Sequence, residues 1–303
     1  MFEGGHPKVS VFIASYQHKE FIREALGSVL TQDYPNLEIV IGDDGSNDGT
    51  QEILKEYKQK YSELIKLTLS EKNAGITVSC NRILKECTGK YIAFMAGDDL
   101  MLPDKISIQT DYMEKHPECS ISYHNLEVFD SAARKTIGLF NDPKVNYPYE
   151  GNAGVIIQYG CFNGAASNMV RRSDCPPHGF DTRIPIASDW LFWVETLMNG
   201  GEIRYIDKVL GKYRIHQNNV SKASSTSILL NFEDHLNSAN IILLNHPEFV
   251  REILYRKSKI YETLITLNKS NNNYIYYRMS NKLRWNWIDR LYGFFYKKIN
   301  SSW

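Results

Sequence analysis

Four short apolar segments alternate with amphipathic segments through the first hundred residues of the chain. We predict a strand for each apolar segment, at 8–14, 37–42, 64–69 and 91–96, because uninterrupted apolar, β-branched runs are typical of buried parallel strands. The segments between them, at 21–30, 50–61 and 78–87, carry apolar residues at helical spacing. Strands and helices in this order predict βαβ units, a mostly parallel sheet and the α/β fold class.

The pattern is less regular in the middle of the chain. Helices are predicted at 104–116 and 190–198, strands at 119–129 and 164–172, and a strand or hairpin at 202–215. Residues 131–150 carry Gly, Asn and Pro without a periodic pattern, which predicts an irregular loop over a binding site.

The end of the chain is expected to be helical. A polar loop at 216–225 precedes a helical pattern from 228 to about 269, a break at 271–273, and a last helix at 282–299 that is rich in aromatic residues. Residues 251–303 contain 11 basic and 3 acidic residues, whereas the whole chain has 35 of each. A basic, aromatic amphipathic helix suits an anionic membrane surface, but aromatic stripes also pack inside proteins or between subunits.

Composition narrows the class of protein. With 303 residues, 43% of them hydrophobic and no net charge, the chain is typical of a globular protein and not of a nucleic-acid binder. Its five cysteines show no zinc spacing, so reduced thiols and a cytoplasmic location are expected. Glu3 and His6 interrupt any early apolar run, so no signal peptide is expected. No uninterrupted apolar segment approaches the ~18–20 residues that a membrane helix requires, so no membrane span is expected.

Carboxylates stand at the ends of two of the predicted strands and before one helix. Asp43 and Asp44 come after 37–42, Asp98 and Asp99 after 91–96, and Asp189 stands before the helix at 190–198. Ligands bind at the carboxyl ends of strands in open α/β sheets, and side chains alternate in direction along extended backbone. One aspartate of a pair can therefore face a sugar hydroxyl and the other a hard divalent cation. The alternative for a lone Asp-Asp pair is a structural polar turn.

Several motifs occur together in order: VSVFIASYQHKEFIREALGSVLTQDYPNLEIVIGDDGSNDGT, then NAG, GDDLMLPDK and SDW. Over about residues 8–216 the chain resembles a family 2 glycosyltransferase with the GT-A fold. The resemblance implies a catalytic domain at 1–225, with a nucleotide-binding half at 1–100 and an acceptor-binding half at 101–225, followed by a helical region at 226–303. It also implies an inverting, metal-dependent hexosyltransferase.

The resemblance implies a nucleotide site at the first strand ends. Tyr16 would lie against the donor base, although Gln17 stands where the family usually has Asn. Asp43 or Asp44 would accept the imide N–H of uracil, which favours a UDP-sugar donor; the alternative for Asp44 is capping of the helix that begins near residue 50. Asp98 would bind the ribose. The nucleotide set implied by the family is completed by Ala14, Ser15, Glu20 and Asn73.

The same resemblance implies a metal and a catalytic base. Asp99 would bind Mn²⁺ or Mg²⁺ that bridges the donor diphosphate, with His216 completing the metal site and Arg214 contacting the diphosphate; the alternative for His216 is a polar surface group. Asp189 would remove the proton of the acceptor hydroxyl, helped by an upward shift of its pKa caused by Trp190 and Trp193. The alternative for Asp189 is a helix N-cap.

The family setting implies transfer of one sugar in O-antigen, capsule or related surface-glycan synthesis. The acceptor would be a glycan or lipid-linked glycan at the inner face of the cytoplasmic membrane, where the protein would be peripheral. The segment 281–285 resembles the QxxRW signature of processive synthases, but its first residue differs and it lies 92 residues after Asp189. Two alternatives remain, a nucleotidyltransferase and a non-catalytic sugar-nucleotide binder.

Overall fold

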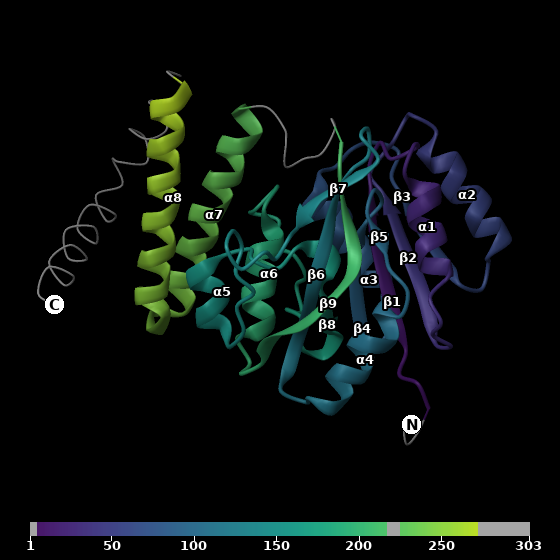
Figure 1. The fold of residues 1–303 in the computed structure, drawn as a ribbon, viewed down its shortest axis with the longest axis horizontal. Helices are drawn as coiled ribbons and strands as arrows, with labels where there is room; N and C mark the ends of the chain where they lie inside the picture. Colours follow the sequence, from purple (N-terminus) through teal and green to yellow (C-terminus); the bar gives the residue numbers. More distant parts are fainter. Residues whose placement is uncertain (1–4, 217–224, 272–303) are drawn as a thin grey trace, which may run out of the picture.

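The computed structural model describes residues 5–216 and 225–271. Its centre is a nine-stranded mixed sheet with strand order β3-β2-β1-β4-β8-β6-β9-β5, and β7 pairs with β6 (Figure 1). The first four strands in this order, β3, β2, β1 and β4, run parallel to one another, as the sequence predicted. Their bounds are β1 Val9–Ser15, β2 Leu37–Asp43, β3 Ile65–Leu69 and β4 Tyr91–Ala96. The α/β class with a mostly parallel sheet is therefore confirmed.

Helices cover both faces of this sheet. Alternate side chains of β1 point to opposite sides, with Val9, Val11 and Ile13 in one core and Phe12 in the other. The first face packs against α1 (Ile22–Leu30), α2 (Thr50–Lys60) and α4 (Lys105–Lys115). The second face packs against α3 (Ile76–Glu86), α5 (Ala153–Tyr159) and α6 (Ser188–Leu197).

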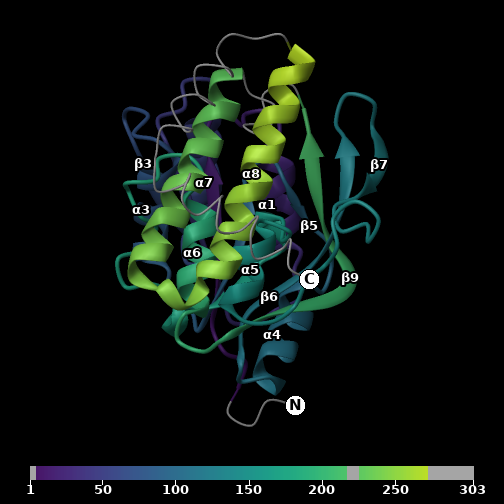
Figure 2. The same cartoon turned by 90° about the vertical axis from the view of Figure 1, so that its left-hand side faces the viewer.

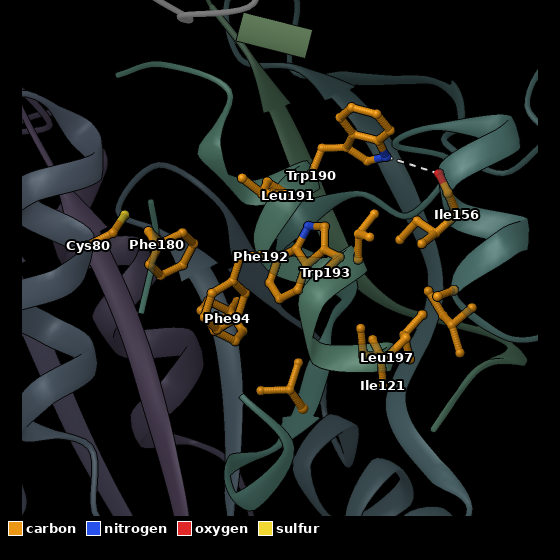
Figure 3. Packing of buried hydrophobic residues seen from close by; sticks show 14 of the residues in the cluster. Cys80, Phe94, Ile121, Ile156, Phe180, Trp190, Leu191, Phe192, Trp193 and Leu197 are labelled. Carbon is orange, nitrogen blue, oxygen red and sulfur yellow. Dashed lines mark hydrogen bonds between the residues drawn. The ribbon is translucent and has the colours of Figure 1, made fainter. Parts of the chain in front are cut away.

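The second core is largely aromatic (Figure 3). The rings of Phe180 and Phe192 stack with centroids 4.1 Å apart, and Phe94 of β4 meets Trp193 edge-on at 4.9 Å. Trp190 Nε1 donates a hydrogen bond of 2.9 Å to Ile156 O, which ties α6 to α5. Such pairs add stability beyond the burial of their area, so α6 is firmly fixed against the sheet.

The second half of the sheet mixes strand directions. The long strands β6 (Cys119–Asp130) and β9 (Glu202–Ile215) pair in parallel, and β8 (Met169–Arg171) lies antiparallel between β4 and β6. The two remaining strands, β5 (Leu100–Met101) and β7 (Lys135–Leu139), pair antiparallel with β9 and β6. β9 is thus paired with β5, the short strand that follows the Asp98–Asp99 pair in the chain.

Several predicted elements differ from the structure. The irregular loop at 131–150 contains β7, and the strand at 164–172 is a 3-10 turn, η1 (Ala165–Ser167), followed by the short β8. The helical pattern from 228 is divided into α7 (Ser225–Asn245) and α8 (Val250–Asn271) by a 3-10 turn, η4 (Pro247–Phe249). A further 3-10 turn, η2 (Arg172–Asp174), and α5 were not predicted.

The helices α7 and α8 lie side by side beyond α5 and α6 (Figures 1 and 2). Leu229 and Leu236 of α7 pack against Ile260 and Leu264 of α8. Other apolar residues of the pair, among them Ile242, belong to the same core as the sheet and α6. No helix within 5–216 and 225–271 has the length and apolar content that a bilayer span requires. The predicted helix at 282–299 lies outside the described residues.

Candidate functional site

The carboxyl ends of β1, β2 and β4 lie next to one another. Parallel pairing sets Ser15 opposite Asp43 and Ala14 opposite Ala96. The chain segments that leave these strands are also bonded, because Gly97 N donates to Ala14 O at 2.8 Å and Asp44 N donates to Ser15 O at 3.1 Å. Strand pairing alone therefore brings the predicted residues at positions 14–16, 43–44 and 98–99 to one edge of the sheet.

Asp43 and Asp44 are buried and hold the loops around them. Asp43 accepts hydrogen bonds from Ser46 N (2.9 Å), Ser46 Oγ (2.6 Å) and Gln51 Nε2 (2.8 Å). Asp44 accepts from the backbone N–H groups of Ala74 (3.0 Å) and Gly75 (2.9 Å). Asp44 does not cap α2, whose N-cap is Gly49. A carboxylate has about four lone-pair positions, so either aspartate retains acceptor capacity for a base N–H.

The loop after β1 presents an exposed aromatic ring. Tyr16 is 44% exposed, and the next residue, Gln17, has a positive φ of 58°. Gln17 N donates to Ser46 Oγ at 2.7 Å, which joins this loop to the one that follows β2. Asn73, in the turn bound by Asp44, accepts a hydrogen bond from Gly75 N through its side chain. The three loops therefore form one bonded unit beside the Tyr16 ring.

The Asp98–Asp99 turn carries two buried, adjacent carboxyl groups. Asp98 Oδ2 lies 2.9 Å from His216 Nε2 and 3.8 Å from His18 Nε2. Asp99 is 4% exposed and accepts a hydrogen bond of 3.0 Å from Arg214 N. Burial, and next the charge of Asp98, raise the pKa of the Asp99 carboxyl well above its usual range. A cation would favour the ionised form of both carboxyls.

His18 belongs to this site and was not predicted. Burial lowers the pKa of its imidazole, although Asp98 acts in the opposite direction. Its Nδ1 is buried and has no hydrogen-bond partner among the described residues. The signal available in the sequence was its position, two residues after Tyr16 in the loop that follows β1.

Arg214 supports the Asp98–Asp99 turn from behind. Its Nε donates to Asp98 O at 2.6 Å and its Nη2 to Glu24 Oε2 at 2.5 Å, while the rings of Phe21 and Phe129 flank its guanidinium at 4.9 and 4.5 Å. The structure thus places this predicted diphosphate contact among protein partners. A separate cavity of about 640 Å³ opens beside it, and the exposed Glu20 lines that cavity.

Asp189 lies on the wall of a larger cavity of about 730 Å³. Ala14, Gly75 and Ala96, which border the nucleotide-site loops and the Asp98–Asp99 turn, also line this cavity. Asp189 stands in the first turn of α6, after the N-cap Ala187, and accepts a hydrogen bond of 2.9 Å from Trp190 N. Burial raises the pKa of its carboxyl. A carboxyl of this kind suits general-base work near neutral pH.

Residues 10–174, more than half of the chain, match the sequence signature described as Glycosyl transferase family 2. The chain belongs to this family. An Escherichia coli member, UDP-Glc:alpha-D-GlcNAc-diphosphoundecaprenol beta-1,3-glucosyltransferase WfaP, is 31% identical over 214 residues, 70% of this chain and 79% of WfaP. EpsE of Bacillus subtilis strain 168, named as a glycosyltransferase, is 39% identical over 124 residues, 41% of this chain and only 45% of EpsE.

A solved structure shows the same fold. TarS of S. aureus, residues 1–349, superimposes with a TM-score of 0.66 at 20% identity, over 87% of this chain and 74% of that chain. This likeness supports the predicted GT-A-like architecture of the family 2 member. The protein is therefore a glycosyltransferase, and the nucleotidyltransferase interpretation is set aside.

The carboxyl groups of the Asp98–Asp99 turn suit a divalent cation whose other ligands come from the phosphates of a bound substrate. Within 5–216 and 225–271 there is no group of three or more His, Cys, Asp or Glu side chains arranged to bind a metal ion. Asp98 and Asp99 nevertheless offer two buried, adjacent carboxyl groups, with the unpartnered Nδ1 of His18 nearby. Mg²⁺ and Mn²⁺ are often held by one or two carboxylates with phosphate oxygens as the other ligands. Asp99 has the chemistry for that role.

Proposed function

We propose that this glycosyltransferase moves a single sugar from a UDP-sugar to an acceptor hydroxyl, with inversion at the anomeric carbon and Asp189 as the base. The position of Asp189 supports this proposal most strongly. Its carboxyl lines the same cavity as Ala14, Gly75 and Ala96, so an acceptor hydroxyl beside Asp189 would face a donor bound at the strand ends.

In the proposed reaction the acceptor oxygen attacks the anomeric carbon as the bond from that carbon to the β-phosphate oxygen breaks. The bonding electrons leave with UDP, and the hydroxyl proton passes to Asp189. A cation bound at Asp99 would neutralise charge on the leaving diphosphate. Asp98 holds the ribose, Tyr16 lies against the base, and Asp43 or Asp44 accepts its N–H. One displacement without an enzyme nucleophile inverts the anomeric centre.

The comparisons support the UDP-sugar and surface-glycan parts of the proposal. WfaP is named for a UDP-Glc donor and an acceptor linked to diphosphoundecaprenol, and TarS has been solved with UDP-GlcNAc. We propose a comparable acceptor for this protein, a glycan or lipid-linked glycan at the cytoplasmic face of the membrane. The proposed catalytic domain is 1–225, and the helical region 226–303 follows it.

The test is release of UDP from a panel of UDP-sugars with Mn²⁺, followed by Asp189→Asn on the best donor. General-base removal should lower the rate by about 10²–10⁴-fold while UDP affinity stays unchanged. Asp207→Asn, at an exposed carboxylate on β9, is the matched control and should keep full activity. Full activity of Asp189→Asn, or a product with retained anomeric configuration, would contradict the proposal, and no turnover with any donor would favour a binding role.

A further inference from the structure

The segment just before Asp189, residues 184–187, has no regular secondary structure and lies against two other elements. α3 contacts it through Thr77, and α7 contacts it through Asp234. Both side chains are almost fully buried, with Thr77 2% and Asp234 3% exposed. The path of this segment determines where α6 begins and therefore where the Asp189 carboxyl lies.

Thr77 bonds to the segment at three points. Its Oγ1 lies 2.7 Å from Ile184 O, 3.0 Å from Pro185 O and 2.8 Å from Ser188 Oγ. A hydroxyl has one proton to donate, so Thr77 shares that proton between the two carbonyl groups. Ser188 then donates to Thr77, and this assignment leaves each of the three contacts with one donor and one acceptor.

Asp234 bonds to two backbone N–H groups of the segment with a single oxygen. Its Oδ2 accepts hydrogen bonds from Ile186 N at 2.7 Å and Ala187 N at 3.0 Å. Hydrogen bonds to an ionised acceptor are about twice as strong as neutral ones. The carboxylate also lies at the N-terminal end of α6, where the helix dipole favours negative charge. Asp234 thus fixes the two peptide groups that lead into α6.

The same part of α3 is bonded to the nucleotide side of the cavity. Gly75, two residues before Thr77, is the N-cap of α3 and donates its N–H to Asp44. The first turn of α3 is thus hydrogen-bonded to Asp44 through Gly75 and, through Thr77, to the 184–187 segment and Ser188. It thereby links a proposed nucleotide-binding residue to the residue next to the proposed base.

We propose that Thr77 and Asp234 are positioning residues that together fix the Asp189 carboxyl relative to the donor loop. This inference rests on the proposed role of Asp189 as the base. It makes α7 part of the catalytic unit although α7 follows the predicted catalytic domain. Neither residue contacts the reacting atoms in this account. Misplacement of a catalytic group by about 1 Å can cost about 10²-fold in rate, which sets the expected size of the effect.

The experiment compares Thr77→Val, Thr77→Ser, Asp234→Ala and Asp234→Asn in the full chain. Thr196→Val is the matched control, because Thr196 is also fully buried but its hydroxyl donates only to Phe192 O within α6. For each variant, kcat and KM are measured with the donor found above, and UDP affinity is measured by calorimetry. Amide hydrogen exchange at Ile186 and Ala187 reports whether the hydrogen bonds from these two N–H groups are intact.

We expect Thr77→Val and Asp234→Ala to lower kcat by about 10–100-fold, with UDP affinity and donor KM within about twofold of wild type. Thr77→Ser keeps the hydroxyl and Asp234→Asn keeps an acceptor oxygen, so both should recover most of kcat. Exchange at Ile186 and Ala187 should quicken in Asp234→Ala. A general loss of folding would instead lower kcat, UDP affinity and melting temperature together.

The proposal is overturned if Thr77→Val and Asp234→Ala have the same kcat as Thr196→Val, or if Thr77→Ser is as impaired as Thr77→Val. If Asp234→Ala does not fold, the Thr77→Val and Thr77→Ser pair decides the outcome alone. Failure of the base assignment is seen separately, because Asp189→Asn would then remain active whatever the Thr77 and Asp234 variants do.

Discussion

Two aspartates of the site are held in surroundings that oppose their ionisation. Burial raises the pKa of Asp189, and burial together with Asp98 raises the pKa of Asp99. Both side chains would be better accommodated as neutral groups if stability alone mattered. Active sites commonly show this conflict between stability and activity, and it leads to a prediction that needs no substrate.

Asp189→Asn should stabilise the protein near neutral pH while removing activity. The folded pKa of Asp189 is raised above the unfolded value of about 3.9, so the folded state holds the proton more tightly. That stability is fully present below pH ~4 and is lost as pH rises through the raised pKa. Asparagine resembles the protonated form and avoids this loss. The variant should therefore exceed wild type in melting temperature by more at pH 7.5 than at pH 4. An equal difference in melting temperature at the two pH values would contradict the account.

The pKa of Glu38, near the start of β2, is shifted downward, opposite to the pKa shifts of Asp99 and Asp189. Burial by itself raises the pKa of its carboxyl, but hydrogen bonds from Lys8, Ser10 and Thr88, with a further contribution from Lys66, outweigh it and the pKa is lowered. Glu38→Ala should cost about 1–3 kcal/mol at pH 7, because the buried Ser10 hydroxyl loses its acceptor.

The pH dependence of the Glu38 effect has a definite sign. Because the folded pKa is depressed, this stability is present above the unfolded value of about 4.3 and is lost as pH falls through the folded pKa. Urea unfolding of wild type and Glu38→Ala should show a smaller difference at pH 3 than at pH 7. A difference that grows toward acid pH would show that the ion pairs do not stabilise the fold.

At the scale of the elements, β9 connects the Asp98–Asp99 turn to the rest of the sheet. Its Arg214 bonds to Asp98 O and Asp99 through different groups. Arg214→Lys would keep the charge but lose the planar, multiple-donor geometry. We expect UDP affinity with Mn²⁺ to fall about tenfold, equal to about 1.4 kcal/mol. Arg204→Lys, on the same strand but paired with Glu202 at the surface, should bind UDP like wild type. Equal affinities in both variants would mean that Arg214 does not support the site.

The sequence predicted the regular elements of the first half because their burial is uniform. β1, β2 and β4 are almost wholly buried, so each appears as an apolar run. β7 was missed because all five of its residues are exposed, and β5 because it has only two residues. The division between α7 and α8 had a signal in Pro247, since the residue before a proline is biased away from helix.

At the scale of the molecule, the sequence could place the acidic clusters but not their partners. Strands that run parallel end at one edge, so Asp43, Asp44, Asp98 and Asp99 could be grouped from sequence alone. The contacts from Thr77 to Ile184 and from Arg214 to Asp98 join residues 107 and 116 positions apart. Such pairs are set by how α3, α7 and β9 pack on the sheet, and local patterns do not encode them.

The most direct test of the whole account is calorimetric titration of UDP, dTDP and GDP into wild type and Asp99→Ala, each with Mn²⁺ and with EDTA. We predict that UDP binds wild type with Mn²⁺, that EDTA weakens this binding strongly, and that Asp99→Ala removes the metal dependence. Metal-independent binding of UDP to both proteins, or no binding to either, would show that the Asp98–Asp99 turn is structural and would contradict the proposed donor site.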